Sequence, residues 1–118
     1  GTLNPLHCTA LGKVLLAFGD LALPASLEAF TPRTITDPET LRLALDDVRR
    51  LGYAVDDEEF DPCVRCIAVP VFDSRGRLVG SMGISGPSSR VTLERLPGLA
   101  AIVLEIGKAL SERMRLNS

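Results

Sequence analysis

Two neighbouring segments carry most of the side chains that could do chemistry. Cys63 and Cys66 are separated by two residues, and Ser81, Gly83 and Ser85 alternate along the apolar stretch that follows. Cysteines at this spacing occur in zinc sites and in dithiol redox centres. A single thiol beside serine hydroxyls instead suits a cavity that hydrogen-bonds a small polar ligand. The choice depends on which of these side chains the fold places on one surface.

The two segments are predicted to form a β-hairpin. Val64–Phe72 and residues 78–85 are rich in β-branched and apolar residues, and residues 73–77 (DSRGR) between them have hairpin-turn chemistry. Pro70 cannot donate a hydrogen bond to a neighbouring strand. It must therefore lie at a sheet edge or at a non-hydrogen-bonded position.

The register of this hairpin decides which side chains share a face. A turn that is symmetric about Arg75 and Gly76 places Cys66 directly opposite Ser85. One face then carries the short side chains of Cys66, Ala68, Ser81, Gly83 and Ser85. The other face carries the apolar side chains of Ile67, Val69, Val71, Met82 and Ile84 and is expected to pack against helices. The small face either packs tightly against another backbone or leaves a cavity, and a slip of one residue would exchange the faces.

A helix start is the second feature that could bind a ligand. Residues 9–18 have apolar side chains at helical spacing behind an N-cap threonine. The N–H groups of Ala10, Leu11 and Gly12 then have no intrahelical partners, and such a helix start attracts anions without a basic side chain. Lys13, in the first turn, is expected to be exposed. If this end faces the small side of the hairpin, a small carboxylate fits between them.

The remaining helices define the fold class. Pro38–Leu51 is the clearest, because an N-cap aspartate, a first-position proline and a C-terminal glycine frame it. Residues 24–30 are expected to add two turns. A last helix is predicted to begin at Leu93 or Pro97 and to run to the chain end. Its apolar stripe comprises Leu96, Leu99, Val103, Ile106, Leu110 and Met114. Helices flanking a small antiparallel sheet are typical of the α+β class.

An acidic run leaves two interpretations open. A short strand at residues 53–55 leads into residues 56–61 (DDEEFD), which form either a solvated loop or the source of a ligand-binding acid. Beside an anionic ligand, Asp56 would have to accept a hydrogen bond from a ligand hydroxyl, a protonated carboxyl group or a bridging water. Arg65 is expected to point away from Cys66 and to pair with an acid.

Composition limits the classes of protein that remain. The chain has 118 residues, 46% of them hydrophobic and 24% charged, which suits one soluble globular domain. A net charge of −2 argues against direct contact with nucleic acid. No apolar run approaches the ~20 residues that span a bilayer, so no membrane contact and a cytoplasmic location are expected. The odd number of cysteines, three, indicates free thiols in a reducing compartment.

Five motifs resemble one known family. They are residues 6–13 (LHCTALGK), 31–36 (TPRTIT), 52–60 (GYAVDDEEF), 64–73 (VRCIAVPVFD) and 84–87 (ISGP). In this order and spacing they closely resemble the effector-binding domain of the IclR family of bacterial transcription regulators. The resemblance covers nearly the whole chain.

The resemblance implies a single, partial effector-binding domain over residues 1–118. Its fold would be α+β and GAF-like, with an antiparallel sheet flanked by helices but without the leading strands of the full domain. It would sense a small organic acid for a transcription regulator, without enzymatic activity and without a cofactor. DNA would be bound only through an N-terminal winged helix-turn-helix absent from this chain. An unpaired sheet edge makes a homo-oligomer the expected state.

The resemblance also implies the ligand-binding positions. Family members hold the ligand with backbone N–H groups at a helix start, an acid, a cysteine and two serines of the last strand. Carried over residue by residue, these positions are Ala10, Leu11, Asp56, Cys66, Gly83 and Ser85. The family often has a hydroxyl where Gly83 stands, which implies a gain in volume and a ligand larger than glyoxylate.

The alternative is a GAF-like thiol or zinc protein that uses Cys63, Cys66 and Cys8. Zinc sites normally contain two closely spaced ligand pairs, whereas the adjacent side chains of His7 and Cys8 diverge. No metal site is therefore predicted. A cysteine nucleophile needs a base within reach, and no spacing brings the single histidine to Cys66. No catalytic residue is predicted.

Overall fold

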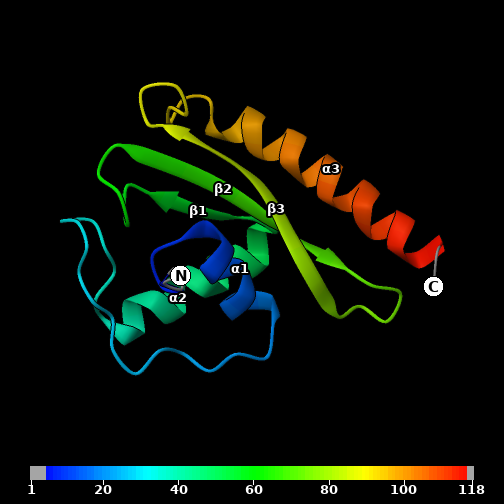
Figure 1. The fold of residues 1–118 in the computed structure, drawn as a ribbon, viewed down its shortest axis with the longest axis horizontal. Helices are drawn as coiled ribbons and strands as arrows, with labels where there is room; N and C mark the ends of the chain where they lie inside the picture. The colour runs from blue at the N-terminus through cyan, green and yellow to red at the C-terminus, as the bar shows by residue number, and fades with distance from the viewer. Residues whose placement is uncertain (1–4, 117–118) are drawn as a thin grey trace, which may run out of the picture.

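The computed structural model describes residues 5–116 as three helices around one small sheet (Figure 1). The elements are α1 (Ala10–Phe18), α2 (Pro38–Leu51), β1 (Ala54–Asp57), β2 (Val64–Phe72), β3 (Leu78–Pro87) and α3 (Leu96–Leu116). The strands form an antiparallel sheet in the order β1-β2-β3. Helices α1 and α2 lie on one side of the sheet and α3 crosses the other (Figure 1). The predicted α+β class is confirmed.

Local sequence signals determine α1 and α2. Thr9 caps α1 by accepting a hydrogen bond from the Gly12 N–H at 3.0 Å. Asp37 caps α2 in the same way, and Gly52 ends α2 in the left-handed conformation with φ of 85°. The buried face of α2 consists of Leu41, Leu45 and Val48. Both helices were predicted at these positions and are confirmed.

The two turns expected at residues 24–30 are absent, because the described segment 21–30 contains no helix. Leu23 and Phe30 of the expected apolar side are 43% and 42% exposed, so the segment has little surface to bury. So short a pattern does not offset the cost of helix nucleation without such packing.

Helix α3 begins at Leu96, between the two predicted starts, and Pro97 lies in its first turn, where no intrahelical N–H is needed. Its buried residues are Ala100, Val103 and Gly107. The predicted stripe is therefore wrong at its C-terminal end, where Ile106, Leu110 and Met114 are exposed. A Cβ atom added at Gly107 would lie 2.7 Å from Val69 Cγ2. The helix uses its small residues, not its largest ones, to approach the sheet closely.

The hairpin of β2 and β3 has the predicted register but a different turn. Asp73 donates its N–H to the Arg77 carbonyl at 2.9 Å, which places Arg75 at the centre of the loop. The expected turn, symmetric about Arg75 and Gly76, is therefore wrong. A bulge leaves Val79 without a partner and shifts the pairing by one residue. Beyond it, the predicted pairs of Cys66 with Ser85 and Ala68 with Gly83 are confirmed.

The small face of the hairpin packs tightly in one part and borders a cavity in another, so both predicted arrangements are present. Ala54 and Ala68 are buried in a core with Ala10 and Val14 of α1, so the sheet packs tightly there. Toward Cys66 and Ser85 the face opens into a cavity. Pro70 pairs with Ser81 of β3 but lies beyond the end of β1, which pairs only as far as Ala68, so this part of β2 is a sheet edge on the β1 side.

Gly83 has a structural role in addition to lining the cavity. A Cβ atom there would overlap the Ile67 carbonyl oxygen of the neighbouring strand. Gly83 also lines the cavity, so the expected gain in volume at this position stays a prediction. Its main effect is to permit close approach of two backbones.

Replacing Gly83 with Ala should lower the free energy of unfolding by about 2 kcal/mol or more, since the backbone must shift to admit the methyl group. Gly80→Ala is the matched control on the same strand, because nothing lies within 4 Å of an added Cβ there. The control should change stability by less than about 1 kcal/mol. Urea unfolding of both variants measures the difference, and equal losses would contradict the close approach at Gly83.

Candidate functional site

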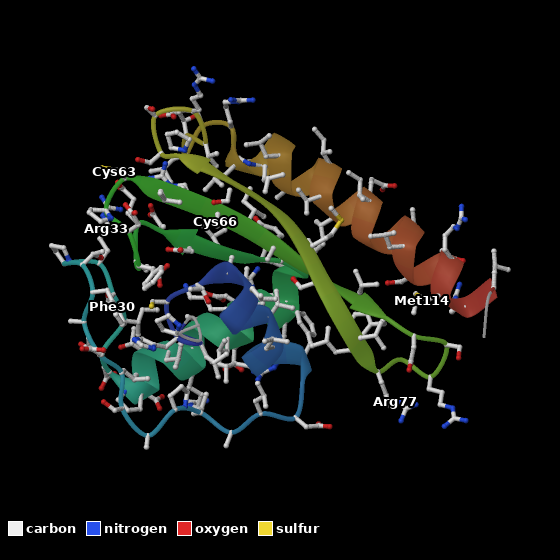
Figure 2. All side chains as sticks on the ribbon, in the orientation of Figure 1. Phe30, Arg33, Cys63, Cys66, Arg77 and Met114 are labelled. Carbon is white, nitrogen blue, oxygen red and sulfur yellow. The ribbon has the colours of Figure 1, made fainter. Side chains whose placement is uncertain are left out.

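A cavity of about 470 Å³ lies where the start of α1, the β1–β2 loop and the β2–β3 hairpin meet. All six residues proposed from the sequence line it: Ala10, Leu11, Asp56, Cys66, Gly83 and Ser85. Figure 2 labels Cys66, which lies near the beginning of β2, and Cys63, which lies just before that strand. The start of α1 and the three neighbouring strands thus bring together residues from four separate motifs.

The start of α1 contributes two free donors to the cavity. The sequence predicted three, but Thr9 Oγ1 accepts the Gly12 N–H, so Gly12 is not available. Within residues 5–116, the N–H groups of Ala10 and Leu11 have no hydrogen-bond partner, and both residues line the cavity. Together with the helix dipole they favour a negatively charged or electron-rich ligand atom.

A thiol and a hydroxyl face the same cavity from β2 and β3. Cys66 Sγ lies 3.1 Å from Ser85 Oγ and donates a hydrogen bond to it. Burial raises the pKa of the Cys66 thiol, the hydrogen bond to Ser85 opposes this, and the Asp56 charge adds to it. The thiol is therefore protonated near neutral pH. It is a small polar group in the lining of the cavity and not a nucleophile.

Asp56 is the buried acid of the cavity. It pairs with Cys66 in the sheet register and is only 3% exposed, so the solvated-loop interpretation is wrong for this residue. Its Oδ1 accepts the Glu59 N–H at 2.8 Å. Burial raises the pKa of Asp56 to about 6, and the Glu59 charge adds to this, whereas hydrogen bonds from backbone N–H groups and the Lys13 charge oppose it. A carboxyl group of this kind can gain or lose its proton near neutral pH.

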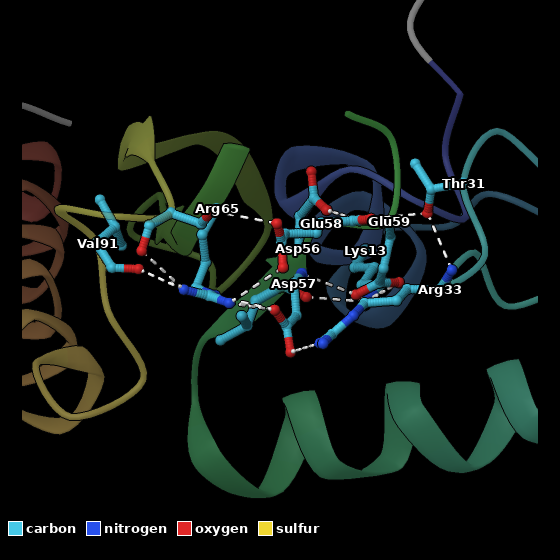
Figure 3. A network of polar contacts seen from close by, with 11 residues as sticks. Lys13, Thr31, Arg33, Asp56, Asp57, Glu58, Glu59, Arg65 and Val91 are labelled. Carbon is cyan, nitrogen blue, oxygen red and sulfur yellow. Dashed lines mark hydrogen bonds and ion pairs between the residues drawn. The ribbon is translucent and has the colours of Figure 1, made fainter. Parts of the chain in front are cut away.

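Lys13 is buried, contrary to the expected exposure, and anchors α1 to the acidic loop (Figure 3). Its Nζ atom donates to the Val55 carbonyl at 2.9 Å and to Glu59 Oε2 at 2.8 Å. Glu59 Oε1 lies 2.8 Å from the same ammonium group but receives no directed hydrogen bond. Glu59 Oε2 also accepts the Asp57 N–H at 3.0 Å. The ion pair thereby joins the two walls that carry Ala10 and Asp56.

Arg65 lies on the sheet face opposite Cys66, as predicted, and pairs with an acid. Its Nε and Nη2 atoms donate to Asp57 Oδ1 at 2.9 and 2.8 Å. Its Nη1 atom donates to the Val91 carbonyl at 2.7 Å (Figure 3). The buried guanidinium group therefore connects the end of β1 to the segment that precedes α3.

The cavity is acidic and contains no cation of its own. Among the described residues that line it, the charged ones are Asp56 and Asp61, and neither a lysine nor an arginine is present. An anionic ligand must therefore rely on backbone donors and on neutral hydrogen-bonding groups.

The three cysteines do not converge. Cys63 is exposed, Cys66 is half-buried, and Cys8 is fully buried, where burial raises its pKa to about 11. His7 places Nε2 2.8 Å from the Glu28 carbonyl. In the part of the chain that the structure describes, no group of three or more His, Cys, Asp or Glu side chains could hold a metal ion. The thiol or zinc alternative gains no support from this geometry.

Sequence reasoning missed the apolar part of the cavity wall. Phe60, in the middle of the acidic run, lines the cavity with Val64 and contacts Phe30 edge-on at a ring-centroid distance of 5.2 Å. The one signal for it was an aromatic residue among five acids. Phe60 adds apolar surface to a cavity that also has polar lining groups.

Comparison with known proteins identifies the family. Residues 1–112 match the family described as "Bacterial transcriptional regulator IclR C-terminal". The chain is 41% identical over 120 aligned positions to the HTH-type transcriptional regulator KdgR of Escherichia coli (strain K12), with coverage of 97% of this chain and 46% of KdgR. The chain belongs to the IclR family, as its effector-binding C-terminal domain, and this family consists of transcription regulators, not enzymes.

Solved structures agree with this assignment. The crystal structure of the C-terminal domain of E. coli KdgR has a TM-score of 0.82 at 40% identity and covers 97% of this chain and 73% of that one. A double mutant of the PobR inducer-binding domain from Acinetobacter, in complex with 3-hydroxybenzoic acid, has a TM-score of 0.84 at 30% identity, with 94% and 67% covered. The chain spans less than half the length of its curated relative KdgR. None of the helices described in residues 5–116 is long and apolar enough to cross a membrane.

Replacing Lys13 with Met should lower the free energy of unfolding by about 3–5 kcal/mol, because Glu59 is left buried and unpaired. The double variant Lys13→Met/Glu59→Gln should recover part of this loss. Lys108→Met on the exposed side of α3 is the control and should change stability by less than about 0.5 kcal/mol. Thermal and urea unfolding measure all three, and a loss at Lys13 no larger than the control would contradict the anchoring role.

Proposed function

We propose that the cavity binds a small organic acid. The carboxylate accepts hydrogen bonds from the Ala10 and Leu11 N–H groups, and the rest of the ligand contacts Cys66, Ser85 and Asp56. The observation that carries this proposal is that Ala10 and Leu11, whose N–H groups have no partner among the described residues, line the same cavity as a thiol, a hydroxyl and a buried acid. The PobR relative bound to 3-hydroxybenzoic acid supports the ligand class.

The size and lining of the cavity favour an acid larger than glyoxylate. A volume of about 470 Å³ lies within the range of roughly 300–1,000 Å³ that is common for small-molecule sites. Phe60 and Val64 supply apolar contact, whereas Asp56 and Ser85 supply polar contact. A short hydroxy or keto acid and a small aromatic acid both have this division of polar and apolar surface.

We further propose that the domain reports ligand occupancy within a cytoplasmic, DNA-binding regulator. DNA would be bound through a winged helix-turn-helix outside this chain, in keeping with the HTH-type relatives. A homo-oligomer is also proposed. The outer edge of β3 has no neighbouring strand among the described residues, and Ile106, Leu110 and Met114 are exposed on α3.

Pyruvate, gluconate and 3-hydroxybenzoate form the test panel for this proposal. An acid at one hundred times its Kd should stabilise the chain by about 2.7 kcal/mol and raise Tm by several degrees. Ser85→Leu should abolish the shift by filling the mouth of the cavity, while the variant remains folded. Ser89→Leu, an exposed serine outside the cavity lining, should keep the shift. Absence of a shift with every acid, or a full shift in Ser85→Leu, would refute the proposal.

A further inference from the structure

The charges around the cavity are unfavourable for an anion. Asp56 and Asp61 line it, and Asp61 is exposed and accepts the Cys63 N–H at 2.9 Å. The cation near Asp56 is Lys13, whose ammonium group is directed to the Val55 carbonyl and the Glu59 carboxylate. It is therefore already paired, and no basic side chain lines the described cavity to balance an entering carboxylate. Two carboxylates in one buried space repel strongly unless one of them takes a proton.

Four titratable groups face Asp56 from the elements packed around it. Lys13 of α1 and Glu59 of the β1–β2 loop balance one another as an ion pair. The thiols of Cys8, just before α1, and of Cys66 on β2 have raised pKa values and stay neutral near pH 7. From β3 the cavity receives the uncharged residues Ser81, Met82, Gly83, Ile84 and Ser85. Asp56 is thus the buried carboxylate whose charge has no counter-ion of its own.

We propose that ligand binding is coupled to the uptake of one proton from solvent by Asp56. The ligand enters as a carboxylate, and the Asp56 carboxylate becomes a neutral carboxylic acid. Total charge in the cavity is then unchanged by binding, because one negative charge and one proton enter together. Neutral Asp56 can also donate a hydrogen bond to a ligand oxygen, which the ionised form cannot do. This inference rests on the proposed function and specifies how pH regulates the same site.

In the protein without ligand, the Asp56 carboxylate is already close to taking up a proton. Burial holds the pKa of Asp56 at about 6, so the group is ionised at pH 7.5 but close to protonation. A second negative charge in the cavity raises its pKa further, and the proton is taken up. Affinity should fall about tenfold per pH unit above pH 6, until the pKa of Asp56 in the complex is reached.

Calorimetric titration of the 118-residue chain tests the coupling. Pyruvate and 3-hydroxybenzoate, both carboxylates at neutral pH, are titrated at pH 7.5 in phosphate and in Tris, which differ in ionisation enthalpy. The difference between the binding heats observed in the two buffers gives the number of protons taken up per ligand. We expect close to one proton per ligand, together with a Kd that rises about tenfold from pH 6.5 to pH 7.5. Binding without proton uptake, at a Kd independent of pH, overturns the inference but leaves the proposed function intact.

Two variants test whether Asp56 is the residue that takes up the proton on ligand binding. Asp56→Asn should bind with no proton uptake and with a Kd that does not change with pH. Asp47→Asn, the same change on the exposed side of α2, should behave like the unaltered chain. Uptake that persists in Asp56→Asn overturns the assignment to Asp56. If Asp56→Asn does not fold, proton uptake by the unaltered chain decides the question. Failure of these two acids and of gluconate to bind at any pH refutes the proposed function and this inference with it.

Discussion

The ion pair between Lys13 and Glu59 is the contact on which the geometry of the cavity depends. It joins two segments that are 46 residues apart and buries both charges between α1 and the β1–β2 loop. One wall of the cavity is the start of α1, and the other is the strand and loop that carry Asp56. Because an unpaired buried charge is costly, the two walls cannot separate without exposing or neutralising both groups. The N–H groups of Ala10 and Leu11 are thereby held in a fixed position beside the polar surface of the sheet.

The sheet provides that surface through backbone geometry more than through large side chains. Gly83 allows β3 to approach β2 closely, and the bulge at Val79 brings Ser85 opposite Cys66. Helix α3 uses Gly107 to pack against the opposite face, so the sheet is supported from behind. Beside Cys66, where the start of α1 meets the hairpin, the packing leaves the open volume of the cavity. The cavity follows from the same packing that stabilises the fold.

Local signals were enough to predict α2, β2 and the pairing of Cys66 with Ser85. The pairing was nevertheless obtained from a wrong turn, because a loop centred on Arg75 and a bulge shift the register in compensating ways. Contacts between distant segments could not be predicted. Burial of Lys13 and Asp56 depends on tertiary packing, whereas charged side chains are normally exposed to solvent. The orientation of α3 was missed for a related reason, since its buried face consists of small residues that a search for large apolar side chains overlooks.

The central claim is that a carboxylate binds at the start of α1, and nuclear magnetic resonance of backbone amides tests it most directly. Titration with 3-hydroxybenzoate should shift the amide protons of Ala10 and Leu11 strongly, because they change from unpartnered to hydrogen-bonded. The Gly12 amide, already bonded to Thr9, should shift less. Shifts confined to α3 or to the turn near Arg75, with Ala10 and Leu11 unchanged, would contradict the account.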